Sequence, residues 1–201
     1  MKKIIFIFFC ISQTIYAQYY VLTTTSLTNP LIDVNFGKHG NYAVDTNNEL
    51  DQYVGLWRYN QNGILFELQI DKRIKYMSKI EYQNNFWYDY QDCVLLRYKL
   101  VKNGNEIYNN LNTTLPIINW ESTGLKYGTS NFLDGKIIDF TRNVYASYEI
   151  NKLTTNNGQQ KIFFNMSEFT YMLLNPIEYY QGSSLPLFNI PINGIEMTKV
   201  N

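Results

Sequence analysis

Residues 54–70 read VGLWRYNQNGILFELQI, and this stretch decides the fold class. Its second half places Ile64, Phe66, Leu68 and Ile70 at every other position, with Glu and Gln among the residues between them. Such period-two alternation is typical of a β-strand that is buried on one face. The Asn-Gln-Asn-Gly sequence before it is a turn signal, so the stretch predicts two strands joined as a hairpin.

Similar short segments recur along the rest of the chain, without a helical stripe longer than about two turns. The further predicted strands are 74–82, Val94–Val101, Glu106–Asn109, Thr114–Trp120, Lys136–Phe140, Val144–Ile150, Lys161–Asn165, Tyr171–Leu174 and Ile195–Val200. The predicted turns between them carry Gly124, Gly128, Asp134-Gly135 and Asn156-Asn157-Gly158. About ten short strands at this spacing favour an antiparallel barrel or sandwich.

The start of the chain has the three parts of a secretory signal peptide. A basic start and the apolar run 4–11 lead to the small residue Ala17, so residues 1–17 are expected to be removed on export. The apolar run is too short to span a bilayer, and no transmembrane span is expected after cleavage. The expected location is the periplasm or the medium, with outer-membrane association as an alternative. Cys10 is a weaker candidate for lipidation, because bulky residues precede it.

The remaining chain is expected to form one domain with an N-terminal extension. Residues 18–47 are rich in turn signals and predict a leader with one or two short strands. A single helical turn over 48–54, capped by Asn47 or Asn48, is expected at the start of the β domain at 48–201.

Charge and cysteine content exclude several classes of protein. Loss of Lys2 and Lys3 with the signal peptide lowers the net charge from 0 to −2, so the chain lacks the basic field that nucleic-acid binding requires. Cys93 is then the sole cysteine, and no internal disulfide can form. The stability of the fold must therefore come from the burial of apolar surface, which the side chains of 18 Tyr, 12 Phe and 3 Trp provide.

The sequence Gly55-Leu56-Trp57 resembles the Gly-x-Trp motif at the first barrel strand of the lipocalin-like proteins. The resemblance implies an all-β, antiparallel up-and-down, lipocalin-like barrel of about 8–10 strands. It assigns Gly55 and Trp57 structural roles, with the Trp closing one end of the barrel and packing against a basic side chain.

A wider resemblance covers most of residues 48–201. The segments 50–59, 66–70, 90–98, 102–106 and 190–199 are similar to an uncharacterised family of small exported bacterial proteins, a domain of unknown function. The resemblance implies a secreted β domain and supplies no activity.

The residues that carry catalysis in other proteins are sparse. His39 is the only histidine, which excludes His-based triads and multi-His metal sites, and it is expected on the surface of a loop. Cys93 is expected to be a small buried residue. Acids lie next to rings at Glu121, Asp89 and Asp92, the pattern of a sugar hydrolase, but 17 acids among so many aromatic residues produce such neighbours by chance. We therefore predict no catalytic residue, metal or cofactor, and a protein that is not an enzyme.

The densest aromatic stretch contains Phe86, Trp87, Tyr88 and Tyr90, more rings than one strand face needs. We predict these four as ligand-binding residues, either as a stacking surface for sugars or as the mouth of a barrel that holds an apolar molecule. The alternative is a strand buried on both faces. A second aromatic pair is Tyr179-Tyr180.

Three functions remain open from the sequence. The first is a lipocalin-like module that binds a small apolar or carbohydrate ligand. The second is a structural or protein-interaction component of the bacterial envelope, with a filled barrel and no ligand. A hydrolase is the third and the least favoured. The state of the barrel interior separates the first two.

Overall fold

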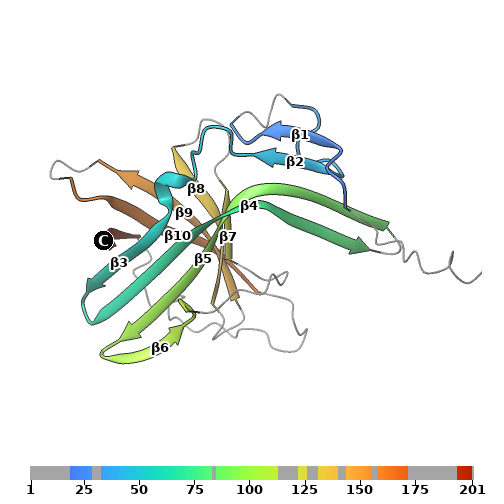
Figure 1. The fold of residues 1–201 in the computed structure, drawn as a ribbon. Helices are drawn as coiled ribbons and strands as arrows, with labels where there is room; N and C mark the ends of the chain where they lie inside the picture. Colours follow the sequence, from blue (N-terminus) through green and yellow to red (C-terminus); the bar gives the residue numbers. More distant parts are fainter. Residues whose placement is uncertain are drawn as a thin grey trace, which may run out of the picture.

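The computed structural model describes residues 19–28, 33–82, 85–112, 122–125, 131–139, 144–154, 158–171 and 194–200. Its elements in chain order are β1 (Thr23–Ser26), β2 (Asn41–Val44), a 3-10 helix (Asp51–Tyr53), β3 (Gly55–Gln61), β4 (Ile64–Tyr82), β5 (Asn85–Lys102), β6 (Asn105–Asn109), β7 (Ser122–Leu125), β8 (Phe132–Asp139), β9 (Val144–Leu153), β10 (Lys161–Tyr171) and β11 (Ile195–Val200) (Figure 1). The predicted residues outside the described ranges are 1–17 with Cys10, Thr114–Trp120, Glu121, Gly128, Asn156-Asn157, 172–174 and Tyr179-Tyr180.

The predicted all-β class is confirmed. The strands form one 11-stranded sheet in the order β1-β2-β5-β4-β3-β11-β10-β9-β8-β7, with β6 paired to β5. A further pairing of residues 94–96 with 122–124 joins β5 to β7. The pairings are antiparallel, except that β1–β2 and β2–β5 are parallel, contrary to the all-antiparallel prediction. Within the described ranges, no helix has the length and hydropathy of a membrane span.

The predicted helical turn exists, but its cap differs from the expected one. The 3-10 helix follows Leu50, which makes no capping bond through its side chain. The carboxylate of Asp45 instead accepts hydrogen bonds from the backbone N–H groups of Glu49 and Leu50, at 2.8 and 3.1 Å. Asn48 has a positive φ of 54° within this turn. Asp45, which lies further upstream, therefore provides the cap that was predicted for Asn47 or Asn48.

The inward faces predicted for β4 and β5 are confirmed. The buried row on β4 contains Phe66, Leu68 and Ile70, and Ile64 at its end packs against the core. The matching row on β5 is Val94, Leu96, Tyr98 and Leu100, all buried. Because every second side chain of a strand points to the same face, these rows meet in one core, which also contains Trp57, Tyr148 and Phe164.

Aromatic rings pack against one another through this core. The ring of Phe66 lies 5.9 Å from Tyr98 and 5.8 Å from Phe164, measured between centroids. Tyr148 stacks on Phe164 at 5.8 Å. These separations are those of favourable ring contacts, so rings from β4, β5, β9 and β10 share a single packed interior.

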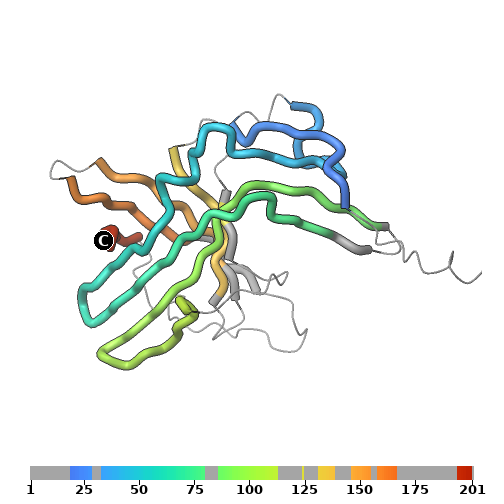
Figure 2. The backbone as a smooth tube through the Cα atoms, viewed as in Figure 1, coloured from blue at the N-terminus to red at the C-terminus, as the bar shows by residue number. Residues whose placement is uncertain are grey.

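A long hairpin extends β4 and β5 beyond this core (Figure 2). The predicted strand 74–82 continues the strand 64–70 without a break, and β3 accompanies β4 only as far as Ile70. The register of β4 with β5 shifts between Arg73 and Tyr76, where Lys75 has a φ of 55°. We call residues 71–93 the arm; β1 and β2, from the predicted N-terminal extension, lie beside it (Figure 1).

Two predicted turns are strands instead. Gly124 lies within β7 and Asp134-Gly135 within β8. Tyr148 pairs with Gly135, and Gly135 pairs with Gly124 on the next strand. A Cβ atom at position 124 would overlap the Tyr148 hydroxyl, so Gly124 leaves the space that this side chain occupies. Burial raises the pKa of Tyr148 well above its ordinary value. Gly124 therefore serves packing, as glycine in a strand interior often does.

Replacing Gly124 by Ala should lower the free energy of unfolding by about 1–3 kcal/mol, because the added methyl group meets a packed ring. In a Tyr148→Phe background the same change should cost at least about 0.5 kcal/mol less, since the overlapping oxygen is gone. Urea unfolding of the four proteins of this cycle measures both values. An equal cost of the alanine in the two backgrounds would contradict the packing role.

Candidate functional site

The predicted ligand-binding residues are divided between the two faces of β5 in the arm. Phe86, Tyr88 and Tyr90 alternate along the strand and share one face, whereas Trp87 lies on the opposite face, half-buried. The structure therefore brings three of the four predicted rings together. Their role in ligand binding stays a prediction.

Residues of the N-terminal extension complete this group of rings. Tyr19 lies 5.1 Å from Phe86 and 5.2 Å from Tyr88, between ring centroids. His39 lies 4.5 Å from Tyr88, edge to face. His39 is exposed in a turn, as the sequence predicted. We call Tyr19, His39, Phe86, Tyr88 and Tyr90 the aromatic cluster.

Hydrogen bonds hold the N-terminal extension over Tyr88 and Tyr90 of the aromatic cluster. The hydroxyl groups of Tyr88 and Tyr90 donate to the backbone carbonyls of Tyr20 and Tyr19, each at 2.8 Å. The N–H of Gly40 donates to the carbonyl of Tyr88 at 2.7 Å. Tyr88 and Tyr90 are thereby only 7% and 8% exposed. Their rings and hydroxyl groups are engaged by the chain itself.

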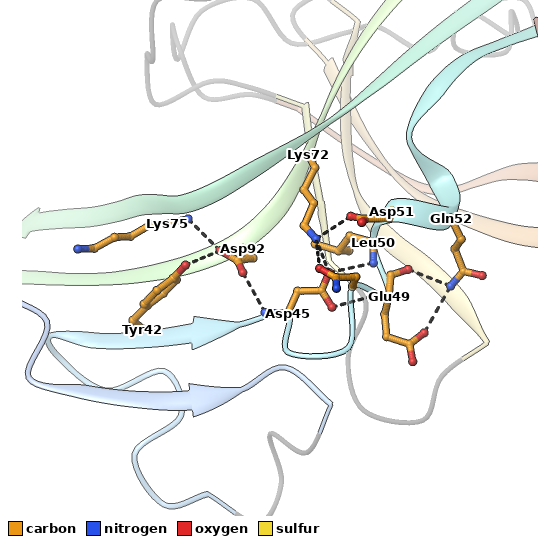
Figure 3. Close-up of polar contacts among 10 residues, drawn as sticks. Tyr42, Asp45, Glu49, Leu50, Asp51, Gln52, Lys72, Lys75 and Asp92 are labelled. Carbon is orange, nitrogen blue, oxygen red and sulfur yellow. Dashed lines mark hydrogen bonds and ion pairs between the residues drawn. The ribbon is translucent and has the colours of Figure 1, made fainter. Parts of the chain in front are cut away.

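Asp92 forms a polar centre at the base of the arm (Figure 3). One carboxylate oxygen accepts hydrogen bonds from the Tyr42 hydroxyl at 2.7 Å and from the Lys75 N–H at 2.9 Å. The other accepts from the N–H of Asp45 at 3.0 Å. Asp92 is 2% exposed, and three donors satisfy a charge that would otherwise be costly to bury. Burial and the bond to Asp92 raise the pKa of Tyr42.

Asp45 continues this network toward the 3-10 helix. Besides the two backbone N–H groups described above, it forms an ion pair with Lys72 at 2.9 Å, and Lys72 also contacts Asp51 at 2.7 Å (Figure 3). Burial alone would lower the pKa of Lys72, but the hydrogen bonds that its ammonium group donates to Asp51 and Asp45 outweigh it and raise that pKa. The network thus connects β2, the bulge of β4 and the helix before β3.

From the sequence, Asp92 was noted only as an acid that lies beside aromatic residues, and no role was predicted for Asp45. A signal for Asp92 exists, because it occupies the inward-facing phase of β5, two residues before Val94. An acid at an inward position requires buried donors. The sequence contains no comparable signal for Asp45.

The candidate carboxylates do not form a pair. Asp89 lies on the opposite face of β5 from Asp92, and Glu121 is outside the described ranges. Burial raises the pKa of Asp89 to about 6, and its Oδ1 has no hydrogen-bond partner among the described residues. Cys93 is fully buried, as predicted. The described part of the chain places no three His, Cys, Asp or Glu residues where they could hold a metal ion.

The Gly-x-Trp motif lies at the other end of the 3-10 helix. Trp57 is fully buried, and its Nε1 donates to the carbonyl of Tyr53 at 2.7 Å. The Nζ of Lys199 on β11 lies 5.5 Å from the Trp57 ring centre, within the range of a cation–π contact. A Cβ at Gly55 would lie 2.7 Å from Cε of Lys199, and the φ of Gly55 is 133°. Glycine here lets the lysine cross the strand and cover the indole.

The fold and the site define an all-β protein built on one large sheet, with an aromatic arm that its own N-terminal extension covers. The chain belongs to a family of unknown function, DUF6705, whose sequence profile matches residues 1–200. The expected membership of an uncharacterised family is thereby confirmed. No curated protein and no solved structure matches the chain.

Replacing Asp92 by Ala should lower the free energy of unfolding by about 2–4 kcal/mol, because it leaves the donors of Tyr42, Asp45 and Lys75 without their acceptor. Hydrogen exchange at the amides of Asp45 and Lys75 should accelerate. The control is Glu196→Ala, which removes an exposed ion pair with Lys161 and should cost less than about 1 kcal/mol. Equal costs for the two variants would contradict the role of Asp92.

Asp89 makes stability depend on pH. Its folded pKa of about 6 lies above the ordinary 3.8, so the stabilising contribution of protonated Asp89 is complete below pH 3.8 and is lost as the pH rises through 6. Discounted for partial exposure, the loss should be about 1 kcal/mol. The Asp89→Asn variant should remove this part of the pH dependence. Denaturant unfolding of both proteins from pH 4 to 7 measures it, and parallel curves would refute the assignment.

Proposed function

We propose that the protein is an exported, non-enzymatic interaction module of the bacterial envelope, in which a filled lipocalin-like barrel carries the arm. The order of the pairings supports the barrel. Strands β3, β4, β5, β7, β8, β9, β10 and β11 each pair with the next in an antiparallel manner, and β11 pairs with β3. Sequential pairing of this kind is the arrangement of an up-and-down barrel.

The packed interior favours a module without an internal ligand. Large rings occupy the core at contact distances, including Phe66, Tyr148 and Phe164. A pocket for a small apolar molecule needs several hundred Å³ of open volume, about that of several large side chains. Aromatic side chains of β4, β9 and β10 occupy the interior space that such a ligand would need.

The observation that carries the proposal is the covering of the aromatic cluster. Tyr88 and Tyr90, two of the predicted ligand-binding residues, lie beneath the N-terminal extension and donate hydrogen bonds to it. A surface that the chain already covers is used for its own assembly. The parts left to contact another molecule are the outer surfaces of the sheet and the arm.

The export and the absence of catalysis are parts of the same proposal. The basic start, the apolar run and Ala17 support removal of residues 1–17 and release into the periplasm or medium, with outer-membrane association as the alternative. Asp89 and Asp92 lie on opposite faces of one strand, which is unfavourable for a hydrolase that needs two carboxylates around one bond.

A small apolar or carbohydrate ligand is the second candidate. It is favoured by the rim of the aromatic cluster, where His39 is exposed and Phe86 is only partly buried. A flat sugar face could stack there against the rings without displacing the extension.

A thermal-shift screen separates the two candidates. The exported protein, purified after removal of the signal peptide, should show no shift with fatty acids, phospholipids or neutral and acidic oligosaccharides. A ligand at 100 times its Kd would stabilise the protein by about 2.7 kcal/mol, a shift of several degrees. A shift that disappears in Phe86→Ala and persists in the distant Lys152→Ala control would replace the interaction module with the ligand-binding module.

A further inference from the structure

We infer that two copies of the chain dimerise through one face of the arm, with Arg73 of each copy paired to Asp89 of the other. This inference deepens the proposed function, on which it rests, by naming the surface and the partner of the interaction module. The surface is the face of β4 and β5 that carries Trp87 and lies opposite the aromatic cluster.

The register of the arm places Arg73 and Asp89 on this one face. Arg73 is paired with Cys93 on β5, and Asp89 is paired with Ser78 on β4. Paired residues of two antiparallel strands point to the same side, and so does every second residue of β5 from 87 to 93. Arg73 and Asp89 therefore share the face opposite the aromatic cluster.

Within the described ranges, Arg73 and Asp89 are the two charged side chains of the arm that have no partner. Arg73 is exposed and forms no ion pair with any described residue. The buried Oδ1 of Asp89 accepts no hydrogen bond, and burial raises the pKa of Asp89 to about 6, since no described cation offsets the cost of its charge. The other described charges of the arm have partners, at Asp71, Lys72, Lys75, Lys79 and Asp92.

The two charges of one copy do not reach each other. Cys93, which lies beside Arg73, is separated from Asp89 by about 13 Å along β5, at the rise of an extended strand. An ion pair requires its charged atoms within about 4 Å. A partner for either charge therefore comes from outside the chain, and a second copy supplies both partners at once.

A two-fold axis through the middle of this face forms both pairs. Tyr76 and Gln91 are paired midway between the two charges. When a second arm is turned over about an axis that crosses the strands there, Arg73 of each copy comes opposite Asp89 of the other. Sheets packed face to face lie about 10 Å apart, a gap that an arginine and an aspartate side chain together can span.

The composition of the face favours a second copy over a partner of one charge sign. An acidic or a basic partner would attract one of the two charges and repel the other, whereas a second copy has the matching arrangement. Trp87 and Tyr76 are half-buried and retain surface to bury, and Trp, Tyr and Arg side chains contribute most to protein interfaces. One hairpin offers a small area, so we expect a weak, concentration-dependent dimer.

The test is a charge exchange, followed by sedimentation equilibrium of the exported protein from about 10 µM to 1 mM. We expect a monomer–dimer equilibrium whose Kd rises at least about tenfold in Arg73→Asp and in Asp89→Arg, because each variant places like charges opposite each other across the axis. An equimolar mixture of these two variants should dimerise as the original protein does, since both ion pairs are then restored with the opposite polarity.

Milder variants serve where circular dichroism shows that a reversed charge prevents folding. Arg73→Gln and Asp89→Asn each remove one charge at nearly constant size and should raise the Kd at least about fivefold, because each dimer loses two ion pairs. The matched controls are Lys152→Glu, at an exposed lysine on β9, and Asp134→Asn, at a half-buried carboxylate on β8. Both controls should leave the Kd unchanged.

Three results would overturn the inference. They are a monomer at every concentration, a dimer whose Kd the variants of Arg73 and Asp89 leave unchanged, and a mixture of folded Arg73→Asp and Asp89→Arg proteins that stays monomeric. Failure of the proposed function is a separate result. A monomer with no shift in the ligand screen would leave an interaction module that binds a different protein, whereas a ligand shift that is lost in Phe86→Ala would overturn the proposed function whatever the oligomeric state.

Discussion

The three hydrogen bonds to the Asp92 carboxylate determine how the arm is joined to the rest of the sheet. They come from Tyr42 on β2, from Asp45 just beyond it and from Lys75 in the irregular part of β4. A carboxylate with so little exposure is tolerated because all three donors are in place, so the three segments can only be ordered together. Asp45 and Lys72 extend this dependence to the 3-10 helix and hence to the strand that carries Trp57.

Local patterns predicted much of the fold. The inward rows on β4 and β5 and the strand at 195–200 follow from alternation alone, because each depends on neighbours within one segment. Gly124 and Gly135 were misread because glycine carries the same signal in a turn as in a strand interior. Only the register across β7, β8 and β9 places both glycines in strands and brings the Tyr148 hydroxyl against Gly124. The covering of Tyr88 could not be predicted either, because its partner Tyr20 is 68 residues away in the chain.

The division of the aromatic run also has a simple physical basis. Alternation sends Trp87 to one face and its neighbours to the other, as the excess of rings over one face had indicated. The residues that the chain places over those neighbours, Tyr19, Tyr20 and His39, belong to the N-terminal extension, whose strands β1 and β2 pair in parallel, and parallel pairing leaves no short-range turn signal. The sequence therefore predicted a group of rings of which three lie together on one face, and their surroundings had to come from the fold.

The position of β11 has a consequence for the order of events in the cell. Of the described strands it is the one synthesised after all the others, yet it lies in the interior of the sheet, between β10 and β3, and supplies the lysine over the indole. Until it emerges, β3 has only β4 beside it among the described strands, and Trp57 lacks the lysine that covers its ring. The interior of the sheet around β3 can consequently be completed only after residues 195–200 have been synthesised, so its assembly is a late event.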